Sequence, residues 1–307
     1  MSIGILVNFL RLGRLLFLGG GFVLHGLGVA AALASGAPLN VAALVWGQVA
    51  ITATQLMTHF SNEYFDLPYD RANQTPTRWT GGSRVLPDGL LAPWVALAAA
   101  LVCGAAALGA VVVLRTAVGS SPLAVGLVGL GIVWSWAYSA PPFRLHARGL
   151  GEATVMLLVP GLTPLVGYAL QTGRVDRMPV LVVAPLCLLQ LAMQLSINFP
   201  DLAGDAASGK RTLAVRLGQP RAAHLHNIAL AAAYLALPLL VWMELPVGVA
   251  AAALTLAPIA AWQLWRVARG AGADPRCWSS LIEWNIVLVM GSAALEAVAL
   301  VGLAGMN

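Results

Sequence analysis

The sequence predicts an all-α integral membrane protein with nine transmembrane helices, and three observations support this fold class. Hydrophobic residues make up 59% of the 307 residues and charged residues only 9%, far below the roughly 25% of a typical soluble domain. Apolar segments recur along the whole chain, each close to the ~20 residues that cross the hydrocarbon core of a bilayer. The basic residues fall almost entirely into alternate connections between these segments.

The apolar segments follow one another with short polar connections, and we assign all of residues 1–307 to one transmembrane domain. Residues 1–14 form a short amphipathic lead-in to the first span. The boundary between the seventh and eighth spans is the least defined, because only Glu244 and Pro246 interrupt the apolar run. The expected spans are about residues 15–35, 41–60, 91–114, 122–138, 152–170, 179–198, 224–243, 246–265 and 281–304.

The distribution of basic residues predicts how the chain crosses the membrane. Of the 17 Lys and Arg residues, 14 lie on one side of the nine expected spans, and only Arg115, Arg174 and Arg177 lie on the other. The side rich in Lys and Arg is normally cytoplasmic. We therefore expect a multi-pass protein of the cell's inner (plasma) membrane, with a cytoplasmic N-terminus and an outside C-terminus.

The composition also bears on other classes of partner and site. No basic run with interleaved aromatic residues suggests nucleic-acid binding, so we expect no nucleic-acid partner and only membrane lipids around the spans. The three cysteines, Cys103, Cys187 and Cys277, are scattered and show neither metal-ligand spacing nor a disulfide framework. We expect them to be unpaired thiols.

Two short acidic segments each follow a long apolar segment, and together they hold four aspartates among the twelve acidic residues of the chain. The first carries Asn62, Asp66 and Asp70 at four-residue spacing, and the second carries Asp201 and Asp205 at the same spacing. This spacing places side chains on one face of a helix, where like charges repel unless a cation lies between them. Carboxylate oxygens are hard ligands that suit Mg²⁺. These five residues are the candidate metal ligands.

Basic residues surround the acidic segments on the same side of the membrane. A diphosphate bound to Mg²⁺ keeps negative charge that Arg and Lys can neutralise, and a hydrocarbon tail would lie among the apolar spans. Of Arg144, Lys210 and Arg211, we expect at least one to contact the diphosphate, Arg144 first. The catalytic candidates are Asp66, Asp70, Tyr138, Arg144, Asp201 and Asp205. The substrate-binding candidates are Asn62, Arg84, Asn198, Lys210 and Arg211.

In combination these residues resemble the motifs of the UbiA superfamily of intramembrane aromatic prenyltransferases. The spacing of Asn62, Asp66 and Asp70 matches the first family motif, and that of Asp201 and Asp205 matches the second. Residues 138–145 resemble the family's tyrosine-to-basic segment. Residues 148–152 and 209–218 resemble the menaquinone branch, the 1,4-dihydroxy-2-naphthoate prenyltransferases. In the second motif the family often carries Asn four residues before the first Asp; here that position is Ile197, and Asn198 follows it.

The resemblance implies nine helices around a central cavity, a Mg²⁺-bound polyprenyl diphosphate, and a small aromatic acceptor that enters near the cytoplasmic end. Prenyl transfer in quinone or lipid biosynthesis is the expected activity. Two alternatives stay open: a terpene cyclase of the same fold, and a transporter of cations or anionic lipids. Transporter sites usually lie near the midplane of the bilayer, whereas these carboxylates lie at span ends. The acceptor, the prenyl chain length and the oligomeric state do not follow from the sequence.

Overall fold

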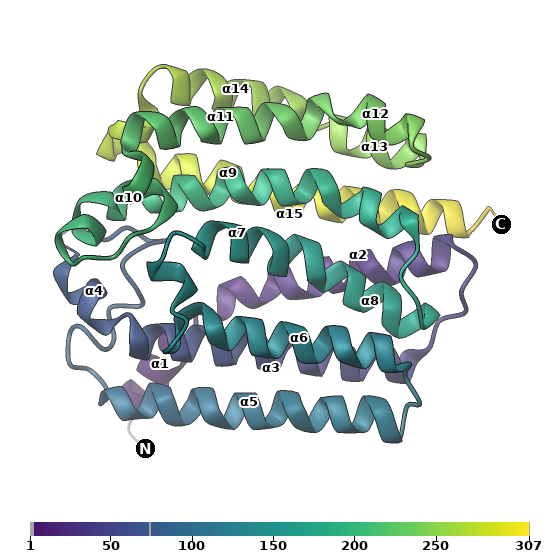
Figure 1. The fold of residues 1–307 in the computed structure, drawn as a ribbon, viewed down its shortest axis with the longest axis horizontal. Helices are drawn as coiled ribbons and strands as arrows, with labels where there is room; N and C mark the ends of the chain where they lie inside the picture. The colour runs from purple at the N-terminus through teal and green to yellow at the C-terminus, as the bar shows by residue number, and fades with distance from the viewer. Residues whose placement is uncertain (1–2, 74, 307) are drawn as a thin grey trace.

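The computed structural model describes residues 3–73 and 75–306, and its long helices run side by side in one bundle (Figure 1). Eight elements are long and apolar enough to cross a membrane. They are Leu15–Ala34 (η1 and α2), Val41–Phe65 (α3), Pro93–Thr116 (α5), Pro122–Ser139 (α6), Gly151–Thr172 (α7 to α8), Arg177–Ala207 (α9), Gln219–Trp242 (α11 to α12) and Pro275–Ala304 (α15).

A ninth span comes from a bent pair of helices. α13 (Val247–Leu254) and α14 (Ala257–Ala268) are too short to span separately, and they meet at an angle of 46°. The turn before α13 places Glu244 at φ 78°, in the left-handed region, so the weakly marked boundary between the seventh and eighth spans is a real break. Counting the bent pair as one span, the predicted nine-helix fold class is confirmed for the described residues.

Short helices lie before and between the spans. They are α1 (Ile3–Leu12), α4 (Leu67–Ala72), η2 (Leu145–Ala147), α10 (Leu213–Leu217) and η4 (Ala271–Ala273). Two of them, α4 and α10, lie at the same end of the bundle. Figure 1 shows α4 and α10 at its left end, whereas α15 runs to the right end. The start of the chain and the end of α15 thus lie at opposite ends of the bundle, as an odd number of spans requires.

Small residues let the helices around the centre approach one another closely. A Cβ atom on Gly28 of α2 would lie 1.9 Å from the Pro164 carbonyl oxygen of α8 (Thr163–Thr172), and one on Gly167 would lie 2.5 Å from the His25 carbonyl oxygen. Glycine at such contacts is typical of helix packing in membranes. Cys103, Cys187 and Cys277 are free, as expected.

The span Gly151–Thr172 is irregular at its middle. Between α7 (Gly151–Met156) and α8, the segment η3 (Leu157–Leu162) forms a π-helix around Pro160. Proline removes one backbone donor, and a widened turn accommodates the carbonyl that loses its partner. Leu158, Val159 and Leu162 of this widened turn line the central cavity described below.

Candidate active site

The first acidic segment lies where α3 ends and α4 begins. Asp66 caps both helices, and Pro68 occupies the first turn of α4, where a missing backbone donor does no harm. Asn62 Nδ2 donates to Asp66 Oδ2 at 2.9 Å and to Ser139 Oγ at 3.1 Å. The bend at Asp66 therefore turns its carboxylate toward the interior, with Asn62 and Asp66 in contact as the four-residue spacing predicts.

The second acidic segment lies inside helix α9, which continues beyond the expected sixth span of residues 179–198. α9 continues through Pro200 to Ala207, because Leu195, Phe199 and Leu202 extend its apolar stripe into a packed cluster. Asp201 Oδ1 accepts a hydrogen bond from Asn73 Nδ2 at 2.7 Å. Asp205 lies one turn further along α9 and is buried. Both aspartates thus face the α3–α4 region from the neighbouring helix.

Lys210 joins the two acidic segments. Its Nζ lies 3.4 Å from Asp66 Oδ2 and 3.6 Å from Asp205 Oδ1, and all three side chains are at most 15% exposed. Burial lowers the pKa of the Lys210 ammonium, but the charges of Asp66 and Asp205 outweigh this and raise it above its ordinary value. A permanent cation therefore lies between carboxylates that belong to different helices.

Asp66 is the charge centre of the site. Burial alone would raise the pKa of its carboxyl, but Lys210, His146 and Asn62 together lower it to about 2. The pKa of Asp70 shifts the other way, to about 7, because burial and the Asp66 charge both disfavour a second anion. The carboxyl groups of Asp66 and Asp70 therefore differ in pKa, although both belong to the same four-residue motif.

His146 of η2 is a site residue that the sequence analysis did not propose. Its Nδ1 donates to the Tyr138 carbonyl oxygen at 2.6 Å, and its Nε2 lies 2.5 Å from Asp66 Oδ1. This second contact lacks hydrogen-bond geometry, and among the described residues both atoms are without a hydrogen-bond partner. The contact is an ion pair when the His146 ring is protonated. The Tyr138 ring lies over His146 with centroids 5.4 Å apart.

The glycine pair in the loop after α4 closes over Asp70. A Cβ atom on Gly82 would lie 2.3 Å from Asp70 Oδ2, and the residue has φ 74°, so glycine is needed both for the close approach and for the backbone conformation. Arg84 Nη1 donates to the Asp70 carbonyl oxygen at 2.6 Å. This loop therefore fixes the backbone and side chain of Asp70.

Three other predicted residues lie away from the carboxylates. The Arg144 and Arg211 side chains are exposed, and Arg144 makes no side-chain hydrogen bond among the described residues. Asn198 Nδ2 donates to Glu152 Oε1 at 2.7 Å instead of facing the aspartates. The structure thus brings Asn62, Asp66, Asp205 and Lys210 together, and their roles as well as those of the other candidates stay predictions.

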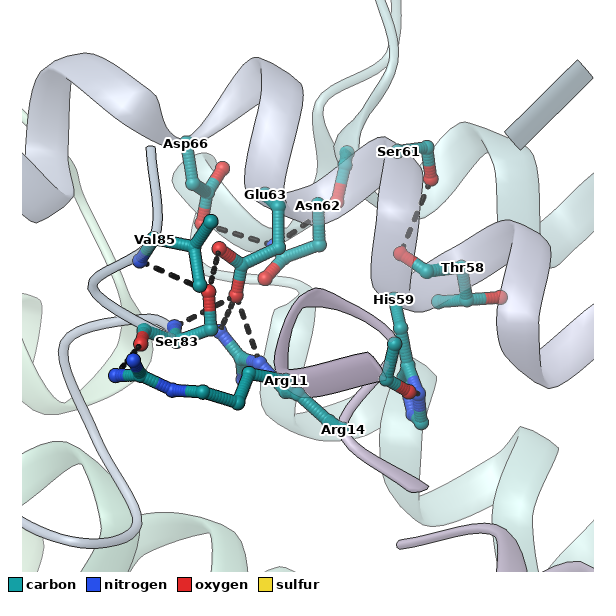
Figure 2. Close-up of polar contacts among 12 residues, drawn as sticks. Arg11, Arg14, Thr58, His59, Ser61, Asn62, Glu63, Asp66, Ser83 and Val85 are labelled. Carbon is teal, nitrogen blue, oxygen red and sulfur yellow. Dashed lines mark hydrogen bonds and ion pairs between the residues drawn. The ribbon is translucent and has the colours of Figure 1, made fainter. Parts of the chain in front are cut away.

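An ion pair beside the first segment was not predicted either. Arg14 donates from Nε and Nη2 to Glu63 Oε1 at 2.8 and 2.5 Å, and Ser83 donates to the same carboxylate through its backbone N and its Oγ. Figure 2 shows Arg14 and Ser83 converging on Glu63, next to Asn62 and Asp66. The Glu63 side chain is fully buried. In the sequence, Glu63 directly follows Asn62 and therefore lies on another face of α3. An acidic residue at such a position indicates a buried cation as its partner.

A cavity of about 320 Å³ extends from this end into the bundle. Its walls are mostly apolar and come from α2, α3, α6, the α7–α8 span and α9, with Met290 of α15. Arg14, Asn62 and Tyr138 line it as well. An amphiphile with an anionic head at Asn62 and a hydrocarbon tail among the spans fits this shape.

The donor set fits Mg²⁺ in chemistry, although it forms no complete coordination shell. No group of three His, Cys, Asp or Glu side chains in residues 3–73 and 75–306 is close enough to hold a metal ion by itself. Mg²⁺ usually takes one or two carboxylates and completes its shell with water and phosphate oxygens. Asp66 and Asp205 provide such carboxylates on neighbouring helices, and Asp66 Oδ1 is buried without a hydrogen-bond partner among the described residues.

Comparison with known proteins identifies the family. The model of the UbiA prenyltransferase family matches residues 23–287, most of the chain. The protein belongs to this family. 1,4-Dihydroxy-2-naphthoate octaprenyltransferase of Bacillus subtilis is 26% identical over 181 residues, 59% of this chain and 57% of the relative. Digeranylgeranylglyceryl phosphate synthase of Pyrococcus abyssi is 29% identical over 167 residues, 54% of each chain. The alignments thus span little more than half the length of these relatives.

Solved structures of this UbiA family share the fold over the full length. A structure described as digeranylgeranylglyceryl phosphate synthase in membranes has a TM-score of 0.68 at 13% identity, covering 97% of this chain and 99% of that one. A UbiA homolog from Archaeoglobus fulgidus, bound to DMAPP and Mg²⁺, has a TM-score of 0.63 at 14% identity, covering 95% and 99%. These likenesses agree with the all-helical membrane fold described above.

Proposed function

We propose that this protein transfers a prenyl group from a polyprenyl diphosphate to an aromatic or other small acceptor inside the membrane, in a reaction that depends on Mg²⁺. The observation that carries the proposal is Lys210 between Asp66 and Asp205, where Asp66 contacts Asn62 at the mouth of an apolar cavity. Such a mouth suits a diphosphate, and such a cavity suits a prenyl tail. The family match and the Mg²⁺ and DMAPP in the Archaeoglobus fulgidus homolog support it.

Different residues would bind the diphosphate head and the hydrocarbon tail of the prenyl diphosphate. Lys210 places positive charge beside Asp66 and Asn62 at the cavity mouth, where the leaving oxygen gains negative charge as the carbon–oxygen bond breaks. A cation there stabilises the transition state more than the ground state, so it raises turnover. Mg²⁺, when held by Asp66 and Asp205, supplies further stabilisation of that charge. The apolar walls hold the tail and exclude water, and the Tyr138 ring can stabilise positive charge on the allylic carbon.

The acceptor is an open part of the proposal. The two relatives named above use different acceptors by their names, a naphthoate and a glyceryl phosphate. Residues 148–152 and 209–218 favour the naphthoate type, and we assign the protein to menaquinone biosynthesis on that basis. A terpene cyclase of the same fold is the second candidate, since the cavity is lined mostly by apolar residues and would also hold a folding prenyl chain.

A product screen tests the proposal directly. Purified protein in lipid nanodiscs is given prenyl diphosphates of several lengths with and without 1,4-dihydroxy-2-naphthoate and other phenols, and products are read by mass. A prenylated acceptor that disappears with EDTA and returns with Mg²⁺ supports the proposal. A cyclic hydrocarbon formed without acceptor would identify a cyclase, and no product with any combination would overturn both enzyme readings.

Topology reporters test the orientation. We propose that the end with α4 and α10 faces the cytoplasm, so that the site opens there and the end of α15 lies outside. The 14-to-3 split of basic residues and the opposite chain ends support this. Alkaline phosphatase fused after Gly305 should be active and should be inactive when inserted at Asp88. The reverse pattern would mean that the orientation is wrong.

A further inference from the structure

His59 presents a free ring nitrogen to the wall of the central cavity. Its Nδ1 lies 2.9 Å from the Gly13 carbonyl oxygen, which can only accept, so Nδ1 carries the proton. In the neutral ring the other nitrogen, Nε2, is then an acceptor with a free lone pair. The His59 side chain lines the cavity. The Gly13 hydrogen bond therefore fixes the tautomer that a base needs.

The position of His59 along α3 relates it to the expected reaction centre. It precedes Asn62 by three residues, so both side chains lie on the same face of α3, with His59 about 4.5 Å further into the bundle. Asn62 contacts Asp66 at the mouth where we place the diphosphate. The first carbon of a prenyl chain follows the diphosphate into the cavity, which brings the bond-forming carbon near the level of His59.

Neighbouring groups suit an acceptor that carries a hydroxyl. Gln55, one turn further along α3, lines the same cavity, and its Oε1 is buried without a hydrogen-bond partner among the described residues. A Cβ atom on Gly21 would lie 2.2 Å from this oxygen, so α2 leaves room for it only because residue 21 is glycine. Phe17 meets the His59 ring edge-on at 6.2 Å and provides an apolar wall. Arg14 adds a cation to this wall.

From these contacts we infer that His59 is the general base of the transfer, an inference that rests on the proposed prenyl transfer. The carbon–oxygen bond of the prenyl diphosphate breaks, and its electron pair leaves with the diphosphate. A new bond forms between the prenyl carbon and a ring carbon of the acceptor, and the acceptor hydroxyl gives up its proton so that the alkylated ring is a neutral ketone. His59 Nε2 takes that proton from the acceptor and later releases it to water.

Substitutions at His59 can remove its role as a base while keeping a donor for the hydrogen bond to Gly13. In His59→Asn the amide nitrogen can still donate to Gly13, but no group can accept the proton. Removal of a general base typically costs 10²- to 10⁴-fold, so we expect turnover to fall at least about 100-fold with a neutral phenol as acceptor. The KM for prenyl diphosphate should change little. His59→Gln, which also lacks a titratable nitrogen, should behave in the same way.

A pair of acceptors tests the role sharply. A phenol whose hydroxyl is already ionised at the assay pH, through a nitro substituent, has no hydroxyl proton to give. The ratio of parent to His59→Asn turnover should therefore shrink by at least tenfold with the ionised acceptor. A role in folding or positioning would lower both turnovers by the same factor, and equal factors would overturn the inference. Thermal unfolding in detergent checks that the variants are folded.

A buried histidine outside the cavity provides the matched control. His25 is 1% exposed, bonds Gln48 and does not line the cavity, so His25→Asn should show no dependence on acceptor ionisation. If neither His59 variant folds, the parent decides: similar turnover with neutral and ionised acceptors supports a base, and transfer only to ionised acceptors overturns it. A parent that transfers nothing refutes the proposed function, whereas an active His59→Asn refutes the base alone.

Discussion

The two acidic segments share one spacing in the sequence and differ in structure. The first breaks at Asp66 into two helices, and its carboxylate contacts Asn62, His146 and Lys210. The second stays inside the continuous helix α9, where Asp201 accepts a neutral hydrogen bond from Asn73 and only Asp205 reaches Lys210. Equal spacing in the sequence therefore leads to different contacts. In the first segment Asp66 contacts Lys210, and in the second only Asp205 does.

This difference indicates that the spacing of a motif does not show which of its carboxylates contacts a cation. Backbone geometry decides which carboxylate meets a cation: a bend turns Asp66 inward, whereas a straight helix separates Asp201 from Asp205 by a full turn. Five sets of variants can break or sharpen this comparison, and the largest effects should come from the residues that contact Lys210.

Removal of Asp66 should have the largest effect. Asp66→Ala takes away the carboxylate that contacts Lys210 and that we propose as a metal ligand, so we expect turnover below detection while the protein stays folded in detergent. Mass-detected product formation measures this. Glu244→Gln, at an exposed position at the opposite end, should keep parental turnover. An Asp66→Ala variant with near-parental turnover would contradict the charge-centre assignment.

Lys210 should follow closely. Lys210→Met removes the cation between Asp66 and Asp205, and we expect turnover at saturating prenyl diphosphate to fall by about 100-fold or more, as when one transition-state donor is lost. Arg144→Ala, whose side chain is exposed, should stay within a few-fold of the parent. Steady-state kinetics on both variants compare them. A larger loss for Arg144→Ala would restore the ranking that the sequence suggested.

Within the second segment, Asp205 should matter more than Asp201. We expect Asp205→Asn to lower turnover about 100-fold and Asp201→Asn about tenfold, a difference of about 1.4 kcal/mol in the barrier. The reason is that Asn at position 201 can still accept from Asn73, whereas Asn at position 205 loses its charge contact with Lys210. Equal losses in the same assay would show that both carboxylates act alike.

The Arg14–Glu63 pair should affect stability. Arg14→Met leaves a fully buried carboxylate without its cation, and breaking such a pair costs about 3–5 kcal/mol. Arg14→Met/Glu63→Met removes both charges and should recover part of this loss. Urea or thermal unfolding in detergent measures both variants. If the double variant is no more stable than the single one, the ion pair is not the source of the loss.

The smallest effect should come from the loop that closes over Asp70. Gly82→Ala forces a Cβ against Asp70 Oδ2 and holds alanine at φ 74°, which costs about 1–2 kcal/mol in the left-handed region. Gly89→Ala is the matched control, because Gly89 has φ 70° and nothing within 4 Å of its Cβ position. The difference between the unfolding free energies of Gly82→Ala and Gly89→Ala measures the contact with Asp70, because both variants carry the cost of alanine at positive φ.

The sequence predicted the features that depend on local pattern. Hydropathy and the alternation of basic residues indicated the spans, and four-residue spacing indicated the contact of Asn62 with Asp66. It also named Lys210 as a site residue, which the structure places beside Asp66 and Asp205, and its role in substrate binding stays a prediction. The identity of a charged residue and its distance from a span end sufficed for these predictions.

Contacts between residues far apart in the sequence could not be predicted from such local patterns. Arg14 pairs with Glu63 across 49 positions and His146 reaches Asp66 across 80, and no periodicity links them. The expected sixth span ended at residue 198, where the apolar run stops, whereas tertiary packing of Phe199 and Leu202 carries helix α9 on through Pro200. Arg144 ranked first by its position after the fourth span, but its side chain lies at the surface.

The joint between α1 and α2 has a practical consequence for anyone who labels this protein. Gly13 and Arg14 connect a short helix with exposed apolar residues to the cavity wall, one through its carbonyl to His59 and the other through its guanidinium to Glu63. A fusion partner or surface tether attached ahead of α1 acts on this joint, where both contacts originate. The end of α15 lies at the opposite end of the bundle (Figure 1), so affinity handles and fluorophores belong there.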